Sequence, residues 1–231
     1  TMTFGLSDGA DYQAKNIEFN SEYTDFDVYF RGEFLISLKI ILKGIHNVYN
    51  ALSVLPSLHQ AGVDLELVKP HFATFAGMGR RFQKVGDFDG ISIYDDYAHH
   101  PTEIKAALSS ALSFKGKNII AVFQPHRYTR LKNLWDEFLN AFDSVNKVVV
   151  TDVYAASEDV IEGVNSENFA QDLSAKGINC EYIGGDMKAV AKKLYPSLKK
   201  DDVVIGLGAG TITAVGRELL ALNKELADVA R

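Results

Sequence analysis

The stretch that decides the fold is Ile119-Ile120-Ala121-Val122-Phe123, followed at once by Gln124-Pro125-His126-Arg127-Tyr128-Thr129-Arg130. A continuous apolar run of this length is typical of a strand buried on both faces, as in a parallel sheet covered by helices. The polar segment after it marks the carboxyl end of that strand, where ligands bind in open sheets of this kind. The stretch therefore predicts a fold class and also the edge of the sheet that carries the chemistry.

The same alternation of strand and helix patterns continues on both sides of this stretch. We expect further strands near residues 91–94, 147–151, 180–183 and 203–206, and helices near residues 101–113, 130–142, 166–176, 187–195 and 211–222. This alternation predicts a Rossmann-like, doubly wound α/β fold, with a mostly parallel sheet and helices on both faces. Polar or glycine-rich segments follow several of these strands and would meet at one edge.

The first 76 residues have a different pattern. Alternating apolar residues predict β-structure, and apolar residues at helical spacing predict helices at 44–61 and 65–75, the second capped by Asp64. We therefore expect two domains, residues 1–76 and 77–231, joined by the flexible segment Gly77-Met78-Gly79. Because Thr1 already lies in a strand-like run, we expect the chain to be a piece of a longer protein.

The composition limits the classes of partner. Apolar residues make up 47% and charged residues 23%, which is typical of a globular protein with a full core. The net charge of −6 gives no reason to expect nucleic acid or an anionic membrane as a partner. No apolar run reaches the ~20 residues of a membrane span. The single cysteine, Cys180, fits a reducing cytoplasm, and its alternating surroundings predict a half-buried strand position.

A cluster of ionisable residues follows the strand expected at 91–94. It reads Asp95-Asp96-Tyr97-Ala98-His99-His100-Pro101-Thr102-Glu103. Pro101 suits the first turn of a helix, where Glu103 would meet the positive end of the helix dipole. A capped turn with solvated charges, a metal site, and a contact with substrate or nucleotide are all open. We favour the third, because adjacent histidines after a strand often point to different sides.

Two arginines follow the buried strand at 119–123. Arg127 and Arg130 would share one face if the segment opens a helix, and paired guanidinium groups suit a carboxylate or a phosphate. The alternative is an ordinary pair of surface arginines. We favour an anion site, because both arginines come directly after a buried strand.

Three further patterns are ambiguous by themselves. The segment Gly79-Arg80-Arg81-Phe82 is either a solvated linker or a pair of arginines that reach a phosphate. Asn47 and Asn50 either cap a helix or present two amides to one ligand, such as an adenine edge. The turn Gly206-Leu207-Gly208-Ala209-Gly210 departs from the dinucleotide pattern, and we interpret it as a tight strand-to-helix turn. The phosphate-loop pattern G-x-x-x-x-G-K-[ST] does not occur in the sequence.

Together these strings resemble the Mur ligases, the ATP-dependent amino-acid ligases of the bacterial cell wall. The matching strings are His46-Asn47-x-x-Asn50, Arg80-Arg81-Phe82, Asp95–Glu103 and Phe123–Arg130, in the order and at the spacing of the family. The resemblance covers essentially the whole chain. It implies that residues 1–76 are the end of a central ATPase domain and that residues 77–231 are the C-terminal, amino-acid-binding domain.

The resemblance implies a reaction of peptidoglycan synthesis in the bacterial cytoplasm. ATP would phosphorylate the carboxylate of UDP-N-acetylmuramate, and the amine of L-alanine would attack the acyl phosphate. It implies ATP contacts by His46, Asn47, Asn50, Arg81 and Asp96, L-alanine contacts by Tyr97, His99, Arg127 and Arg130, and catalysis by Arg81 and His99. His100 and His126 are further, weaker candidates.

The resemblance also implies that several parts of the active site precede Thr1. These are the UDP-binding domain, the phosphate-binding loop, the Mg²⁺ ligands and a carbamylated lysine, so we expect no metal ligand in this chain and no ligation by the chain alone. Three alternatives stay open. They are a ligase that recycles murein tripeptide, a metal-dependent hydrolase that uses Asp95, Asp96, His99, His100 and His126, and a noncatalytic nucleotide- or partner-binding domain.

Overall fold

The computed structural model describes residues 2–20, 22–42, 44–112, 114 and 116–229. The chain divides into two compact units, and the division falls between Met78 and Gly79. We call the preceding residues unit 1 and the following residues unit 2. The strand-like start at Thr1 and the expected helix end at Ser113 lie outside the described residues.

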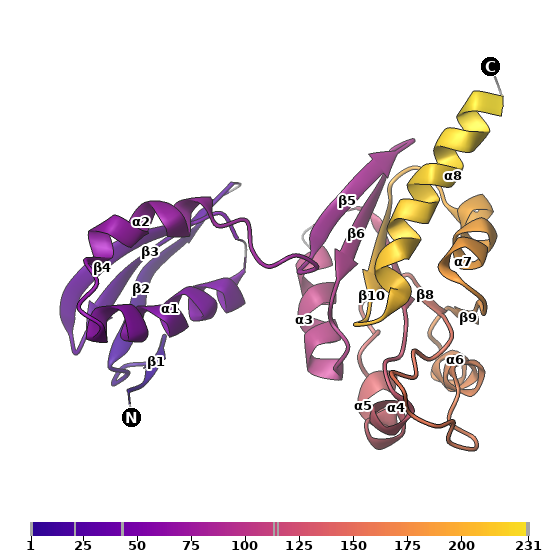
Figure 1. Ribbon diagram of the computed structural model, residues 1–231, viewed down its shortest axis with the longest axis horizontal. Coiled ribbons are helices and arrows are strands. Elements are labelled where there is room, and N and C mark those ends of the chain that lie inside the picture. The colour runs from indigo at the N-terminus through magenta and orange to yellow at the C-terminus, as the bar shows by residue number, and fades with distance from the viewer. Residues whose placement is uncertain (1, 21, 43, 113, 115, 230–231) are drawn as a thin grey trace. The chain divides into compact units, whose positions relative to one another are not determined.

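Unit 1 is a four-stranded sheet packed against two helices (Figure 1). Its strands are β1 (Phe4–Gly5), β2 (Tyr12–Phe19), β3 (Thr24–Phe30) and β4 (Glu33–Ile40), in the order β1-β2-β3-β4, and its helices are α1 (Ile45–Gln60) and α2 (Leu65–Thr74). Strand β1 is parallel to β2, and the other pairs are antiparallel. Asp64 caps α2 as expected, because its carboxylate accepts the N–H of Glu66 at 3.0 Å.

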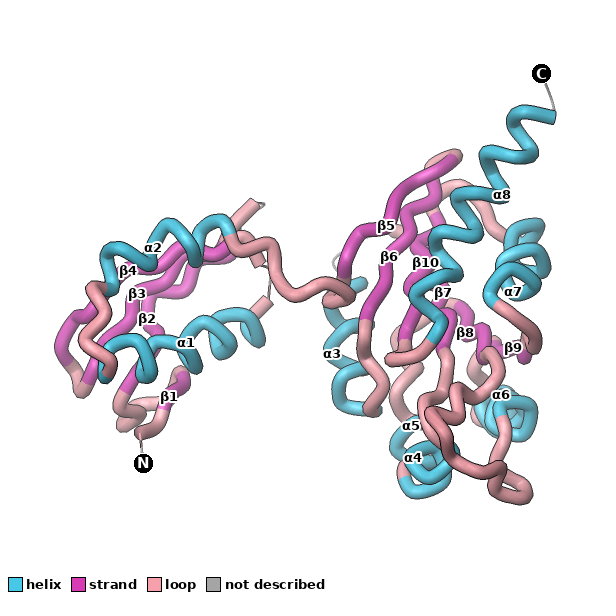
Figure 2. The backbone as a smooth tube through the Cα atoms, viewed as in Figure 1, coloured by secondary structure: helices cyan, strands magenta, loops and turns pink. Residues whose placement is uncertain are grey.

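Unit 2 is a six-stranded sheet with helices on both faces, which confirms the predicted fold class (Figures 1 and 2). Its strands are β5 (Gln83–Phe88), β6 (Ile91–Asp96), β7 (Asn118–Phe123), β8 (Lys147–Val150), β9 (Cys180–Tyr182) and β10 (Asp202–Leu207), in the order β5-β6-β10-β7-β8-β9. All neighbouring pairs are parallel except β5 and β6.

The helices of unit 2 divide between the two faces of the sheet. One face packs against α3 (Pro101–Ala111), α4 (Tyr128–Asn133), α5 (Trp135–Leu139) and α6 (Ser166–Ala175), and the other packs against α7 (Met187–Leu194) and α8 (Val215–Val229). Short 3₁₀ turns, η1 (Tyr195–Ser197) and η2 (Thr211–Ala214), follow α7 and precede α8. None of the helices in the described ranges is both long enough and apolar enough to cross a bilayer.

The central strand β7 is buried on both sides, as its apolar run predicts. Ile119, Ala121 and Phe123 belong to the core under α3–α6, and Ile120 and Val122 belong to the core under α7 and α8. The strand is apolar and buried from Ile119 to Phe123, and the polar segment begins directly after it, at Gln124. Because β10 lies between β6 and β7, the carboxyl ends of these three parallel strands lie side by side.

Two helices and one strand differ from the predicted elements. The helix expected at 130–142 starts at Tyr128 and breaks at Leu134, whose φ of −120° and ψ of 26° lie outside the helical range. The helix expected at 211–222 starts as η2 and continues as α8 to Val229. Strand β5 was not expected. It forms an antiparallel edge with a register shift between Lys84 and Gly86.

Candidate functional site

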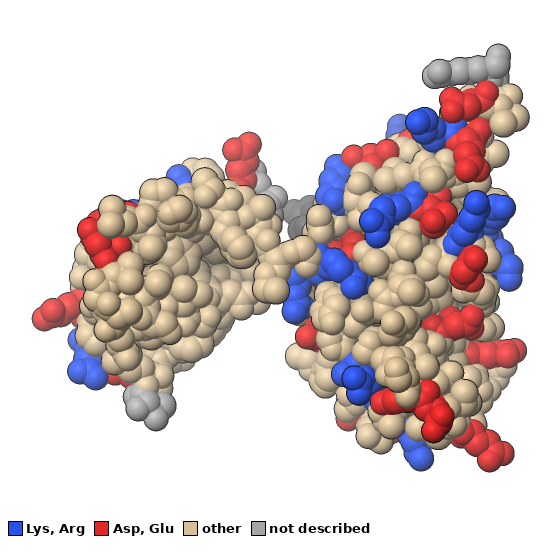
Figure 3. All heavy atoms as spheres, in the orientation of Figure 1, with Lys and Arg blue, Asp and Glu red and all other residues tan. Residues whose placement is uncertain are grey.

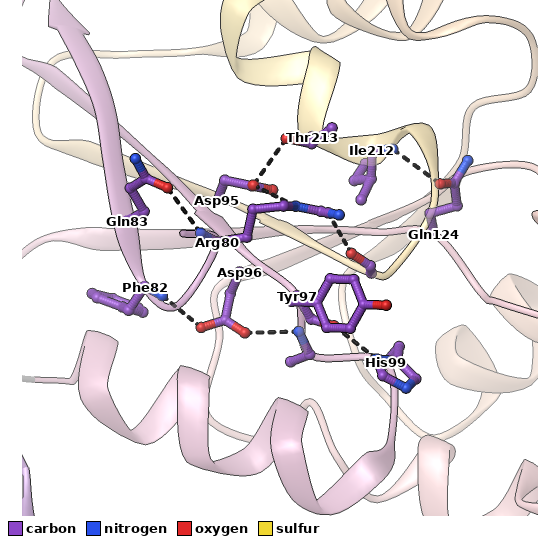
Figure 4. A network of polar contacts seen from close by, with 12 residues as sticks. Arg80, Phe82, Gln83, Asp95, Asp96, Tyr97, His99, Gln124, Ile212 and Thr213 are labelled. Atoms are coloured by element: carbon purple, nitrogen blue, oxygen red, sulfur yellow. Dashed lines mark hydrogen bonds and ion pairs between the residues drawn. The ribbon is translucent and has the colours of Figure 1, made fainter. Parts of the chain in front are cut away.

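Two carboxylates at the end of β6 are both held by donors of the protein (Figure 4). Asp96 accepts the backbone N–H groups of Phe82 and Ala98, each at 2.7 Å, and is 6% exposed. Burial raises the pKa of Asp96, although the two N–H donors oppose that rise. Asp95 accepts from Nε of Arg80 at 2.9 Å and from the hydroxyl of Thr213 at 3.0 Å. Both carboxylates thus stabilise the turns around them.

The two adjacent arginines before β5 have different surroundings. The guanidinium of Arg80 is bound to Asp95 and donates to the carbonyl of Gly208 at 2.6 Å. The guanidinium of Arg81 lies over the ring of Tyr97, 5.8 Å from its centroid, and has no ion-pair partner among the described residues. Of the two, Arg81 is therefore the cation that is available to a ligand.

The next group, at the start of α3, contains Tyr97 and His99, whose rings meet edge to face at 5.0 Å. Nδ1 of His99 lies 2.9 Å from the carbonyl oxygen of Tyr97 and 3.4 Å from a carboxylate oxygen of Glu103. Both of these oxygens are acceptors, so Nδ1 carries the proton and Nε2 of the neutral ring is left as an acceptor. His100 instead caps α3, where its Nδ1 accepts the N–H of Thr102 at 3.3 Å.

His126 follows β7 and faces His99, with 5.8 Å between the ring centroids. Arg130 donates to Nδ1 of His126 at 3.0 Å, so the neutral imidazole of His126 carries its proton on Nε2. The ring of Tyr154 stacks on His126 at 5.4 Å, with 15° between the planes. Burial lowers the pKa of His126, and the nearby Arg130, His99 and Arg127 lower it further. In their neutral forms the two imidazoles thus present opposite groups, an acceptor on His99 and a donor on His126.

Arg127 has an unusual backbone. It precedes α4 with φ 72° and ψ 134°, a region that non-glycine residues rarely occupy. Its N–H donates to the carbonyl of Tyr154 at 2.8 Å, and its guanidinium lies 3.8 Å from Glu158. Glu158 also accepts the N–H and the hydroxyl of Thr129 at 3.0 and 2.6 Å, and these bonds lower the pKa of Glu158. The loop after β8 therefore holds Arg127 in place.

The glycine-rich turn after β10 packs tightly against this region. A Cβ at Gly210 would lie 2.5 Å from Oε1 of Gln124 and 2.5 Å from the ring of Tyr154. Gln124 itself accepts the N–H of Ile212 at 3.0 Å and so joins β7 to η2. This packing agrees with the interpretation of the segment as a tight strand-to-helix turn.

In unit 1, the candidate residues at the start of α1 contact one another. The amide of Asn50 donates to Oδ1 of Asn47 at 3.1 Å, and the amide of Asn47 lies 3.1 Å from Nε2 of His46. The N-cap position of α1 belongs to Gly44, with φ 92°, so the capping role considered for Asn47 is wrong. The two amides lie on one face of the helix, and the side chains of His46 and Asn50 are exposed.

Sequence reasoning grouped Arg127 with Arg130, but the structure directs Arg130 to His126 and Arg127 to Glu158. Tyr97, His99, His126 and Arg130 are brought together at the carboxyl edge. Glu158 was missed. Its contact with Thr129 spans 29 positions, and no local pattern marks it.

Among the described residues, neither a metal-binding cluster nor the cavity found in unit 2 coincides with this group. Across the described ranges, no three His, Cys, Asp or Glu side chains are grouped so that they could hold a metal ion. A cavity of about 600 Å³ lies at the ends of β7 to β10, but none of the predicted site residues is among its described lining. Figure 3 shows Lys and Arg interspersed with Asp and Glu on the visible face of unit 2. The predicted site residues of unit 2 are therefore paired polar groups outside this cavity, with Asp96 buried and Tyr97 exposed.

Comparisons with known proteins point in one direction. Residues 80–210 match the family model described as Mur ligase, glutamate ligase domain. A UDP-N-acetylmuramate–L-alanine ligase of Caldanaerobacter subterraneus subsp. tengcongensis is 38% identical over 225 residues, which is 97% of this chain and 49% of that protein. The chain spans about half the length of the curated relatives it matches.

Solved structures agree in fold. The crystal structure of a UDP-N-acetylmuramate-alanine ligase from Thermotoga maritima superposes with a TM-score of 0.77 at 27% identity, over 97% of this chain and 48% of that chain. A murein peptide ligase from Psychrobacter arcticus gives a TM-score of 0.68 at 19% identity, over 95% of this chain and 45% of that chain. The second likeness is one of fold alone.

Proposed function

The chain belongs to the Mur ligase family, and we propose that it contributes to the ligation of L-alanine to UDP-N-acetylmuramate in bacterial peptidoglycan synthesis. In this reaction the γ-phosphate of ATP passes to the muramate carboxylate. The amine of L-alanine then attacks the acyl phosphate, so that an amide forms and phosphate leaves. The observation that carries the proposal is the grouping of Tyr97, His99, His126 and Arg130 beside Arg127 at the carboxyl edge of the sheet.

Arg127 is the proposed contact for the carboxylate of L-alanine. Its guanidinium is half-exposed, and its single ion pair among the described residues, with Glu158 at 3.8 Å, is too long to saturate its donors. A carboxylate would receive charge-assisted hydrogen bonds from this side chain. Arg130, which is bound to His126, would add positive charge beside it and orient the donor on Nε2 of His126.

His99 is the proposed proton acceptor. The ammonium group of L-alanine must lose a proton before its nitrogen can attack, and a neutral imidazole with a free Nε2 is suited to receive that proton. Glu103 and the carbonyl of Tyr97 support this role, because they hold the other proton on Nδ1. The ring of Tyr97 would wall the space for the small methyl side chain.

ATP contacts are proposed on both units. In unit 1, His46, Asn47 and Asn50 lie near the start of α1, and amides of this kind have the donors and acceptors suited to adenine. In unit 2, Arg81 would offset charge on the phosphates, and Asp96 would accept ribose hydroxyls with the lone pairs that Phe82 and Ala98 leave. We propose that Mg²⁺, which would neutralise phosphate charge during transfer, is held by residues outside this chain.

The test supplies the half of the relatives' length that this chain does not span, either in trans or fused in cis. Phosphate release from ATP is then measured with UDP-N-acetylmuramate and L-alanine, L-serine, glycine or murein tripeptide. We expect release that depends on L-alanine and on the added half. Alanine-dependent release by the 231-residue chain alone would contradict the proposal that its active site is incomplete.

The same reconstituted protein, measured also for hydrolysis without ATP and for ligand binding, separates the alternatives. A preference for the tripeptide would favour the recycling ligase. Hydrolysis that disappears with a chelator, returns with zinc or manganese, and needs no ATP would favour the metal-dependent hydrolase. Ligand binding without any turnover, even after the added half is supplied, would favour a noncatalytic binding domain.

A further inference from the structure

The segment Arg80-Arg81-Phe82 is bound to the rest of unit 2 through its backbone (Figure 4). The N–H of Arg80 donates to the side chain of Gln83 at 2.8 Å, and the carbonyl of Arg80 accepts the N–H of Tyr97 at 2.7 Å. The N–H of Phe82 donates to Asp96 at 2.7 Å. These contacts fix the backbone on both sides of Arg81.

The backbone on both sides of Arg81 is also strained. Arg80 has φ 61° and Phe82 has φ 46°, and left-handed conformations are unfavourable for residues with a Cβ. Such conformations persist only where the surroundings enforce them, and they gather at functional sites. The direction in which Arg81 leaves the backbone therefore depends on the contacts of its two neighbours.

The side chain of Arg80 supplies the strongest of these contacts. It binds Asp95, which is 5% exposed, and it reaches the carbonyl of Gly208 in the turn after β10. The other oxygen of Asp95 is buried without a hydrogen-bond partner in the described part of the chain. A buried carboxylate is costly unless a paired charge compensates it, and Arg80 is the cation paired with it here. Arg80 thereby binds the ends of both β6 and β10.

We infer that Arg80 is a positioning residue, whose ion pair with Asp95 holds Arg81 in the direction that phosphate binding requires. The guanidinium groups of both arginines lie over the ring of Tyr97, at 5.0 Å for Arg80 and 5.8 Å for Arg81. The guanidinium of Arg80 is engaged by protein contacts, whereas that of Arg81 is available to a ligand. This inference rests on the proposed function, in which Arg81 meets the phosphates of ATP.

The first test uses the 231-residue chain itself and does not depend on ATP. Amide hydrogen exchange is measured in the wild type, in Arg80→Gln and in Arg80→Lys, with Arg217→Gln as the control. Arg217 lies exposed on α8, and its replacement removes the same charge. We expect exchange at the N–H groups of Phe82 and Tyr97 to rise about tenfold or more in Arg80→Gln, with little change in β7. Unchanged protection at these two groups would overturn the inference.

Arg80→Lys guards against a variant that fails to fold. Lysine keeps the charge that compensates Asp95 but cannot reach Asp95 and the carbonyl of Gly208 with one planar fork. We expect this variant to keep the exchange rates of β7 and to raise exchange at Phe82 and Tyr97 by a smaller factor than Arg80→Gln. An equal rise throughout the sheet in both variants would show that Arg80 serves stability alone, which would also overturn the inference.

The second test is a double-mutant cycle in the reconstituted ligation assay. If Arg80 acts through Arg81, then Arg80→Gln lowers kcat about tenfold in the wild-type background, leaves the KM for L-alanine unchanged, and has almost no effect in an Arg81→Met background. Independent, multiplying effects of the two changes would contradict the inference. If Arg81→Met leaves the ATP kinetics unchanged, the proposed function of Arg81 has failed, and the exchange result still decides whether Arg80 holds the segment.

Discussion

At the residue scale, Arg127 combines a half-exposed guanidinium with a backbone that the surrounding loop enforces. A charge-assisted hydrogen bond contributes about 1.5–3 kcal/mol, which corresponds to roughly a ten- to hundredfold change in affinity. We expect Arg127→Ala to raise the KM for L-alanine by about that factor in the reconstituted assay, with a smaller effect on the KM for ATP. An unchanged KM for L-alanine would show that the carboxylate binds elsewhere.

Glu158→Gln is the matched variant for that experiment. The amide oxygen of glutamine still accepts from Thr129, so the loop stays attached, but the negative charge 3.8 Å from Arg127 is removed. We expect the KM for L-alanine to fall or to stay within about threefold, because a half-exposed ion pair at this distance contributes little. A rise in the KM for L-alanine as large as that of Arg127→Ala would mean that Glu158 acts on the substrate directly.

His126 predicts a pH dependence of stability. Its pKa is lowered below 6.5 by burial and by the positive charges of Arg130 and Arg127 and by His99, with Glu158 opposing. The unfolded chain therefore binds more protons than the folded chain below about pH 6.5, so stability falls as the pH drops through that range. The urea midpoint should decrease from pH 7.5 to 5.5, and it should decrease less in His126→Gln. The lowered pKa of Glu158 acts in a separate window, below its ordinary value of 4.5.

At the element scale, the turn between β10 and η2 depends on Gly210. Its Cβ would lie 2.5 Å from both Gln124 and Tyr154, so Gly210→Ala must displace the ring that stacks on His126. We expect a destabilisation of about 1–3 kcal/mol in urea unfolding, together with a raised KM for L-alanine. Gly206→Ala, near the end of the adjoining strand β10, is the control, since its Cβ would meet its nearest neighbour at 3.5 Å. Equal effects of both changes would contradict this account.

The elements that sequence reasoning predicted are those with strong patterns. The structure confirms the sheet that the apolar run at β7 and the alternation around it predict. A strand buried on both faces has a continuous apolar run, which is a strong pattern. Strand β5 escaped prediction because Gly86 and a register shift interrupt its pattern. The break at Leu134 has no glycine or proline to mark it.

The candidate site also has a part that local sequence patterns predicted and a part that they could not predict. Local strings predicted that His99, His126 and Arg130 lie near the carboxyl edge, because both histidines closely follow a strand end and Arg130 comes about one helical turn after His126. The partners of Arg80 and Arg127 could not be predicted, because each lies far away in sequence. Arg80 binds Gly208 across 128 positions, and Glu158, which pairs with Arg127, binds Thr129 across 29 positions. Arg80 and Arg81 look equivalent in the sequence. Only the tertiary contacts show that Arg80 is bound to the protein and that Arg81 is available to a ligand.

At the scale of the whole molecule, each unit has its own hydrophobic core, with two layers in unit 2 and one in unit 1. A unit with its own core is expected to unfold cooperatively by itself. We therefore expect urea to unfold the 231-residue chain in two transitions, and a shorter chain of residues 79–231 to reproduce one of them. A single transition that the shorter chain does not reproduce would contradict the independence of the units.

The unit that binds L-alanine can be identified by the unfolding transition that L-alanine shifts. A ligand at about 100 times its Kd stabilises the unit that binds it by about 2.7 kcal/mol, so saturating L-alanine should shift one transition and leave the other in place. All of the proposed contacts for L-alanine lie in unit 2, so the shifted transition should be the one that residues 79–231 reproduce. Arg127→Ala should abolish the shift, because the carboxylate loses its cation, whereas Arg217→Gln should preserve it. A shift confined to the other transition would place the amino acid on unit 1 and would overturn the assignment of Arg127.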